Sequence, residues 1–303
     1  MMAYVMILLA VACFAAQFAF TKLYESVAGQ TATASLVMLV GTGLVGALIF
    51  FCAVGFSVSF SPVSALWAAI FAVIMIPYYM IGIKVLSLGS LAVYSMFMVL
   101  GGMLVPFFYG IIFLKENISI AQIVGTVLLT VFIVLQAIWQ KEPDKNKNTD
   151  ERGKYLYFVL CILIFFINGM TGVIAKAHSI SDGAVDEARF TVTYCAMTAI
   201  LSLAILLISC LKNGQAKAKV IRGALKIKPI AVMVLLGAAT YGGNYLQLLA
   251  ADKVPASVQF PLVSGGVIVL SALVSVLFFK KKISKKEWIS VAGAFVSTFL
   301  FAF

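Results

Sequence analysis

Apolar runs of about twenty residues recur along the whole chain, and they limit its fold more than any other feature. An α-helix needs about 20 apolar residues to cross the roughly 30 Å hydrocarbon core of a bilayer. Inside that core, only helices and closed barrels satisfy their own backbone hydrogen bonds. Barrel strands alternate polar and apolar residues over about ten positions, whereas these runs are apolar throughout. The sequence therefore predicts an all-α integral membrane protein.

Ten such segments can be counted in the 303 residues, of which only 11% are charged. The first resembles the core of a signal peptide, but it has no basic leading region and exceeds the roughly 7–15 apolar residues of such a core. It is therefore expected to remain as a first transmembrane helix. The ten predicted segments are 2–21, 31–54, 63–84, 90–113, 118–140, 155–176, 188–211, 229–250, 255–279 and 284–303.

Lysines and arginines are concentrated in alternate connections between these segments. Cytoplasmic loops of membrane proteins are enriched in both residues. With the N-terminus outside, 18 of the 22 lysines and arginines face the cytoplasm, including five lysines between Lys280 and Lys286. The pattern predicts a multi-pass protein of the cell (plasma or inner) membrane with both termini outside. The net charge of +11 then reflects membrane topology, and no nucleic acid is expected as a partner.

The residues that usually form disulfides, metal sites and proton relays are sparse. The cysteines form no C-x-x-C pair and are expected to be buried as small apolar residues. The single histidine, His178, is expected to be solvated in a loop at 177–187, and Lys176 is expected to extend to the membrane interface. No cofactor or metal is expected. The five cysteines are Cys13, Cys52, Cys161, Cys195 and Cys210.

The chain also contains a candidate internal repeat. A shift of 165 residues places "FLKENIS" (113–119) on "FFKKKIS" (278–284), and in both copies a long helix with a central glycine pair precedes a short polar junction and a last helix. Because each half has five helices, an odd number, the second half must be inverted relative to the first. The halves are 1–140 and 155–303, joined by a charged linker loop at 141–154.

The stretches "GGMLVPFFYGIIFLKENIS" (101–119) and "QFPLVSGGVIVLSALVSVLFFKKKIS" (259–284) resemble the repeat ends of EamA-type members of the drug/metabolite transporter superfamily. The resemblance implies ten transmembrane helices in two inverted five-helix repeats. Segments 1, 3, 4, 6, 8 and 9 would surround a central cavity, and small organic solutes would cross by alternating access. The family typically has a glutamate in each junction; Glu116 fits the first, but Lys281 replaces the second.

Uncharged polar residues inside the segments are the candidates for solute binding, because no Asp or Glu lies in the central part of any segment. Amides and tyrosines offer hydrogen bonds and ring faces, which suit neutral, zwitterionic or amphipathic solutes. Each residue taken singly can instead make a hydrogen bond between helices. The candidates are Gln17, Tyr78, Tyr79, Tyr94, Asn168, Tyr241, Asn244, Tyr245, Gln247, Gln259 and Ser264.

Two glycine pairs lie in the middle of predicted helices: Gly101 with Gly102, and Gly265 with Gly266. Close packing between helices is one explanation of membrane glycines. A hinge for alternating access is the other, because gating repeats need positions that bend.

These features favour a secondary transporter of a small organic metabolite or drug-like solute, an exporter or exchanger rather than an enzyme. Its expected partners are the small-molecule substrate and membrane lipids, and a homodimer is compatible with the chain. The alternative is a membrane-embedded enzyme acting on lipid-borne substrates, for which Asp182, Asp186 and His178 are the available catalytic groups. A third alternative is a sensor or partner subunit that transports nothing.

Overall fold

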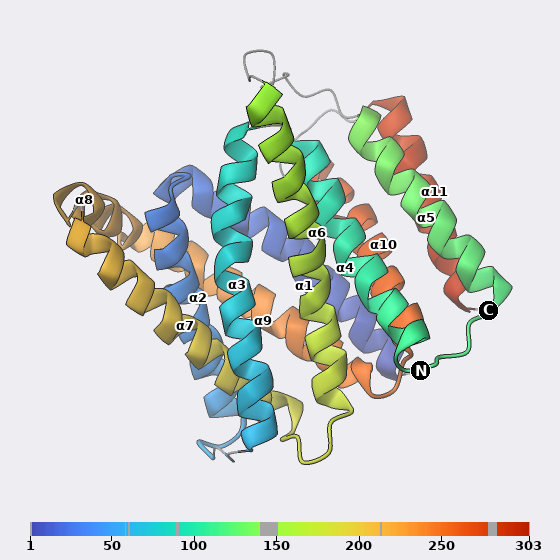
Figure 1. Ribbon diagram of the computed structural model, residues 1–303, viewed down its shortest axis with the longest axis horizontal. Helices are drawn as coiled ribbons and strands as arrows, with labels where there is room; N and C mark the ends of the chain where they lie inside the picture. The colour runs from blue at the N-terminus through green and yellow to red at the C-terminus, as the bar shows by residue number, and fades with distance from the viewer. Residues whose placement is uncertain are drawn as a thin grey trace.

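The protein is a bundle of helices, several of which are long enough to cross a membrane (Figure 1). Every regular element in the described part of the chain is helical, and nine of the helices have the length and apolar composition of a membrane span. The protein is therefore a helical multi-pass membrane protein. The computed structural model describes residues 2–57, 59, 61–88, 91–139, 151–212, 214–277 and 284–302.

The nine long helices agree with nine of the predicted segments to within a few residues at most ends. Prolines begin or precede some of them, where a missing N–H removes no helical hydrogen bond. The helices are α1 (Met2–Ala28), α2 (Ala32–Ala53), α3 (Pro62–Leu88), α4 (Leu91–Ile112), α5 (Ile120–Trp139), α6 (Glu151–Ser179), α7 (Glu187–Lys212), α9 (Ile227–Ala251) and α10 (Ala256–Leu277).

Two shorter helices depart from the prediction. Helix α8 (Gly214–Ala224) lies in a connection that was expected to be a loop. Its apolar residues recur at helical spacing, and Ile221 and Ala224 pack on the core while Lys219 and Arg222 are on the surface. The tenth predicted segment is α11 (Lys285–Phe299), only 15 residues long, followed by a 3-10 turn.

The predicted charged linker is also shorter than 141–154. Helix α6 begins at Glu151, so residues 151–154 are helical. The rest of the linker, to residue 150, lies outside the described residues.

The outer faces of the bundle are apolar. Leu44, Ile120 and Ile200 are among many large hydrophobic side chains that stay exposed on these helices. A surface of this kind suits lipid and would be a liability in water. Cysteine burial is a partial correction: Cys161 and Cys195 are buried, but Cys52 is exposed and the remaining two are partly exposed.

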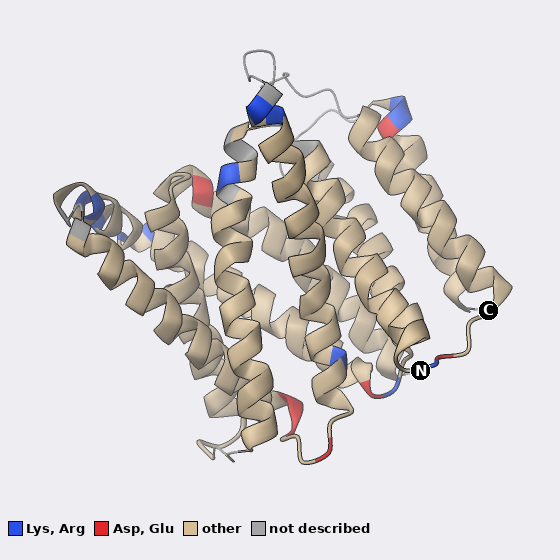
Figure 2. Cartoon of the chain, in the orientation of Figure 1, with Lys and Arg blue, Asp and Glu red and all other residues tan. Residues whose placement is uncertain are grey.

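The helix neighbours form a regular set. Helix α1 packs on α9 and α10, α6 packs on α3 and α4, and α2 packs on α7 and α9. Helix α7 also contacts α3, α4 contacts α10, and α5 pairs with α11 at one edge of the bundle (Figure 1). Both chain ends lie at one end of the bundle, which we call the terminal end (Figure 1). Most lysines and arginines lie at the other, which we call the basic end (Figure 2).

Glycines allow the helix axes to approach closely where they cross. A Cβ on Gly101 of α4 would overlap the backbone carbonyl of Phe165 in α6, and a Cβ on Gly169 of α6 would lie 2.6 Å from the carbonyl oxygen of Gly101. On α2, a Cβ at Gly46 would lie 2.5 Å from the ring of Tyr241. Small residues are favoured at these positions because they allow the helix backbones to pack closely, as in membrane proteins generally.

We expect Gly101→Ala to destabilise the bundle, because the added methyl meets backbone that cannot rotate away. Overpacking of this kind costs about 1–3 kcal/mol, which thermal unfolding in detergent would detect as a lower midpoint. The matched control is Gly242→Ala in α9, where a Cβ has nothing within 4 Å. An unchanged midpoint for the first variant would contradict the packing.

Candidate functional site

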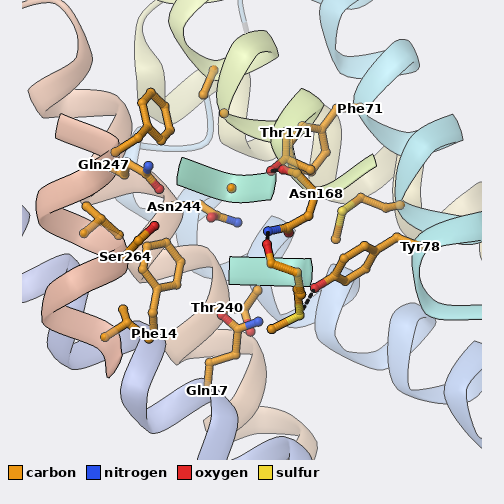
Figure 3. A pocket seen from close by; sticks show the side chains of 18 of the residues that line it. Phe14, Gln17, Phe71, Tyr78, Asn168, Thr171, Thr240, Asn244, Gln247 and Ser264 are labelled. Carbon is orange, nitrogen blue, oxygen red and sulfur yellow. Dashed lines mark hydrogen bonds between the residues drawn. The ribbon is translucent and has the colours of Figure 1, made fainter. Parts of the chain in front are cut away.

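A cavity of about 170 Å³ lies between α1, α3, α4, α6, α7, α9 and α10 (Figure 3). Six of these are the helices that the family resemblance predicts around a cavity; α7 is the addition. Every described residue that lines the cavity is uncharged. Those with polar side chains are Gln17, Tyr78, Tyr79, Asn168, Thr171, Tyr194, Thr240, Asn244, Gln247 and Ser264.

Helix α9 supplies one polar wall. Thr240, Asn244 and Gln247 are spaced by four and three residues, so they share one face of the helix. All three line the cavity, as the sequence "YGGNYLQ" predicts for its two amides. Gly243 in this stretch lets α9 approach α1, since a Cβ there would meet the ring of Phe14 at 3.0 Å.

Helices α4 and α6 supply the opposite wall where they cross. The Asn168 amide donates a hydrogen bond of 2.7 Å to the backbone carbonyl of Met98. Gly102 leaves room for this amide, because a Cβ there would lie 2.7 Å from its nitrogen. The Tyr78 hydroxyl donates to the Met98 sulfur at 2.9 Å, so α3 is joined to the same point (Figure 3). One methionine therefore anchors polar groups from two neighbouring helices.

Aromatic rings line the cavity toward the terminal end. Phe71 of α3 and Tyr194 of α7 have ring centroids 4.6 Å apart, and Phe190 lies 5.3 Å from Tyr194. All three line the cavity, and Phe190 is only 1% exposed. Phe14, Phe18 and Phe260 add further ring faces. The site therefore combines amide and hydroxyl hydrogen-bonding groups with aromatic rings that pack at tilted angles.

The structure brings together seven of the eleven candidate residues predicted from the sequence. Gln17, Tyr78, Tyr79, Asn168, Asn244, Gln247 and Ser264 line the cavity, and their role in binding stays a prediction.

The other four candidates lie elsewhere. Gln259 is fully buried, and its amide donates to the backbone carbonyl of Gln247 at 2.6 Å, so it bonds one helix to the next. Tyr94 packs against Gly82, Tyr241 is buried beside Gly46, and the Tyr245 ring lies 4.8 Å from that of Phe50.

The four predicted hinge glycines all lie within continuous helices and contact neighbouring elements. Gly101 and Gly102 lie against α6, as described above. A Cβ on Gly265 would overlap Thr298 of α11, and one on Gly266 would lie 2.9 Å from Val11 of α1. Close packing therefore explains each glycine; bending at these points stays a prediction.

His178 and Lys176 correct two sequence expectations. His178 is not in a solvated loop: it lies in α6, is 1% exposed, and stacks on the Phe190 ring with centroids 3.6 Å apart. Its Nε2 is 3.0 Å from the Ser64 hydroxyl, which also accepts a bond from the Val185 N–H at 2.9 Å. Lys176 does not extend to the interface but is buried, at 6% exposed. The predicted segment ended at residue 176, whereas α6 continues to Ser179. Both residues therefore lie within the last turn of the helix and not in the loop.

Several residues of the site were not predicted from the sequence. Phe190 and Tyr194 lie in a helix that the resemblance leaves out of the cavity, although they are four residues apart and share a face. Thr171 and Thr240 were available as hydroxyl groups within apolar runs. Threonine is a weak signal, because its hydroxyl often bonds the carbonyl one turn back, as Thr171 does with Asn168 at 2.6 Å.

Comparisons with known proteins give the fold and no more. No family model and no curated protein match this chain. Twenty-eight chains of solved structures resemble it. One is the crystal structure of a protein that is 14% identical and aligns with a TM-score of 0.68, over 98% of this chain and 95% of its own. The overall fold therefore recurs in a solved structure across nearly the whole length.

We expect Ser64→Ala to lower the stability of the terminal end, because it leaves the Val185 N–H and His178 Nε2 without their partner. An unpaired buried polar group costs about 1–3 kcal/mol, measurable as a lower unfolding midpoint in detergent. Ser26→Ala is the control, since Ser26 is exposed and bonds only the Leu23 carbonyl of its own helix. Equal midpoints for the two variants would contradict the buried arrangement.

Proposed function

We propose that the protein is a secondary transporter, an exporter or exchanger, that moves a small organic solute by alternating access. The observation that carries the proposal is the cavity, which is bordered by helices from both halves of the chain and combines amides, hydroxyls and rings without a charged group. Pockets with a few polar groups among apolar walls are typical of small-molecule sites. The halves would move against each other around a solute bound between them.

We propose further that the chain consists of two inverted five-helix repeats, with α11 as the tenth crossing. Exchanging α1 with α6, α2 with α7, α3 with α9, α4 with α10 and α5 with α11 maps the main neighbouring pairs onto one another. Three helices also begin 165 residues after their counterparts, the shift expected from the sequence. The paired first residues are Pro62 and Ile227, Leu91 and Ala256, and Ile120 and Lys285.

This arrangement is the one expected of EamA-type members of the drug/metabolite transporter superfamily, and we propose membership on the repeat-end sequences quoted above. The fold likeness to solved structures is compatible with it. The proposed halves remain 1–140 and 155–303.

For orientation, we propose that the basic end faces the cytoplasm of the cell membrane. Figure 2 shows more Lys and Arg at this end than at the terminal end. Lys84 lies near the end of α3 and Lys154 in the first turn of α6, whereas Lys253 lies in the turn between α9 and α10. Positively charged loops favour the cytoplasmic side. Both termini would then lie outside.

The solute class follows from the chemistry of the lining. A solute with a net charge would lose its hydration in the cavity and find no opposite charge among the side chains described there. Amide groups both donate and accept hydrogen bonds, and rings stack on planar or apolar parts of a solute. We therefore propose a neutral, zwitterionic or amphipathic substrate, with membrane lipids as the other partners.

The enzyme alternative gains no support from the candidate catalytic groups. His178 is stacked on Phe190 inside the bundle. Burial raises the pKa of Asp186, but hydrogen bonds and the positive charge of Arg189 outweigh it and hold that pKa below its usual value. No cluster of possible metal ligands occurs among the described residues. A non-enzymatic carrier is the simpler proposal.

The test is solute flux into liposomes that contain the purified protein, using a panel of labelled neutral and zwitterionic metabolites. We expect saturable flux of at least one of them. Asn244→Ala should weaken its apparent affinity about twofold to tenfold, since one hydrogen bond contributes about 0.5–1.5 kcal/mol.

Gln30→Ala is the matched control, because its side chain is exposed between α1 and α2 and bonds only Glu25. Absence of flux for every solute would contradict a carrier. If the Asn244→Ala variant transports with unchanged affinity, the solute-binding site lies elsewhere. A proton gradient imposed on the same vesicles separates a proton-coupled carrier from an exchanger.

A further inference from the structure

A glutamate in one half of the chain caps a helix of the other half. Glu116 lies in the connection between α4 and α5, and its carboxylate accepts bonds from the Ala256 N–H at 2.8 Å and the Ser257 N–H at 2.9 Å. It also accepts the Ser257 hydroxyl at 2.8 Å. These groups begin α10, whose first N–H groups have no partner within the helix. A negative charge there is favoured by the helix dipole as well.

A buried lysine holds the preceding helix in the complementary way. The Lys176 ammonium of α6 donates to the backbone carbonyls of Ala251 and Val254, the latter at 3.2 Å. These carbonyls belong to the end of α9 and the turn after it, where helix carbonyls lack partners and a cation is favoured. The short turn between α9 and α10 is therefore held by an anion at one end and a cation at the other.

The chain around Glu116 is fitted to this contact. A Cβ on Gly110 would overlap the carboxylate of Glu116, so a larger residue there would displace this carboxylate from its present position. Lys115 adopts a left-handed backbone conformation, with φ of 53°, which is unfavourable for a lysine. A strained residue persists only where its surroundings compensate for it; here the next N–H, that of Glu116, bonds the Gly110 carbonyl at 3.1 Å across the turn.

The terminal end, where this contact lies, is the more tightly packed end of the bundle. Residues 256–261 of α10 are all buried, whereas residues 93–96, which match 258–261 after the 165-residue shift, are only partly buried. Helices α6 and α9 pack together at this end. Their counterparts α1 and α3 make no comparable contact in the described part of the chain.

The cavity follows the same asymmetry. Toward the terminal end Leu248 and Phe260 are buried, at 2% and 3% exposed, while Ala175 and Gln247 are partly exposed. Toward the basic end Phe18 is 39% exposed, and Tyr78 and Tyr79 are partly exposed. The aromatic side chains of the lining are therefore more buried toward the terminal end than toward the basic end.

The sequence makes the two ends chemically different. The 165-residue shift matches Glu116 with Lys281, which lies outside the described residues. A lysine has no acceptor atom and cannot receive N–H bonds from a helix start. Lys281 therefore cannot make a carboxylate contact of the Glu116 type.

On the basis of the proposed carrier function, we propose that Glu116 and Lys176 form a latch on the turn between α9 and α10 that keeps the terminal end of the solute cavity closed. Opening that end requires α10 to leave Glu116, and the start of α10 then loses its acceptor. The latch favours the state that is open at the basic end. Glu116 and Lys176 are positioning residues, because neither touches the cavity.

Side-specific labelling tests the latch without any solute. The reporter is Ser264→Cys, in the cavity, in a chain whose five native cysteines are replaced by alanine. A membrane-impermeant maleimide is added to either side of oriented proteoliposomes. We expect labelling mainly from the basic end, and at least a fivefold faster rate from the terminal end once Glu116→Gln is added. Gln offers one acceptor oxygen in place of two and no charge.

Glu287→Gln is the matched control. Glu287 also caps a helix start, but it accepts its bond from the N–H of Ser284, the N-cap residue of its own helix, α11. This bond therefore does not connect the two halves of the chain. It should leave the labelling pattern unchanged. Ser257→Ala, which removes only the hydroxyl bond to Glu116, should give a smaller shift in the same direction and serves if Glu116→Gln fails to fold.

Equal labelling patterns for folded Glu116→Gln or Ser257→Ala and the parent would overturn the latch. The same change in labelling pattern for Glu287→Gln would also overturn the latch, because the loss of any helix cap would then be enough to cause it. Failure of the carrier function appears differently: the labelling shift occurs, but no solute flux is found in the liposome assay.

Discussion

Close approach of helix backbones is the interaction on which the bundle depends, because lipid tails are as apolar as the side chains and give helices no hydrophobic reason to associate. Contact then comes from small residues at the crossings. Gly101 and Gly169 bring α4 against α6, and Gly46 makes room for Tyr241 between α2 and α9. The same approach sets the distance between the walls of the cavity, since Asn168 reaches the Met98 carbonyl only where these two helices meet.

Polar groups inside such a bundle have few acceptable places. A polar side chain facing lipid has no partner, so it turns inward and either bonds a neighbouring helix or faces the cavity. Gln259 does the first and Asn244 the second. Glu116 and Lys176 show a third solution, in which charged groups bond the free ends of helices. Both of these helix-end contacts lie on the turn between α9 and α10.

The same rule explains how much of the site was predictable. Gln17, Asn168, Asn244 and Gln247 were identified because an amide in an apolar run must face inward, and inward is where the cavity lies. What the rule leaves open is whether an inward residue meets a helix or the cavity, which depends on helix rotation and neighbours. Gln259 faces inward as expected, but its amide bonds the Gln247 carbonyl of the neighbouring helix and does not line the cavity.

The fold predictions that failed concern short stretches whose composition does not reveal a helix. Helix α8 was taken for a loop because its lysines outweigh its few apolar residues in a simple hydropathy count. His178 was taken for a loop residue because a helix that continues past the apolar run leaves no mark in composition. The presence of each long helix was predictable, because an apolar run of about twenty residues matches the thickness of a bilayer. The exact helix ends were not, because they depend on tertiary contacts such as the bond between Ser64 and His178.

The shortness of α11 has a consequence for the surrounding membrane. From Trp288 through the 3-10 turn to Ala302, its apolar part rises about 24 Å, at roughly 1.5 Å per α-helical and 2.0 Å per 3-10 residue. A typical hydrocarbon layer is about 30 Å thick. If α11 crosses as proposed, the bilayer along the edge formed by α5 and α11 must thin by several ångströms. Such mismatch costs fractions of a kcal/mol per ångström, so lipids with shorter acyl chains should gather at that edge.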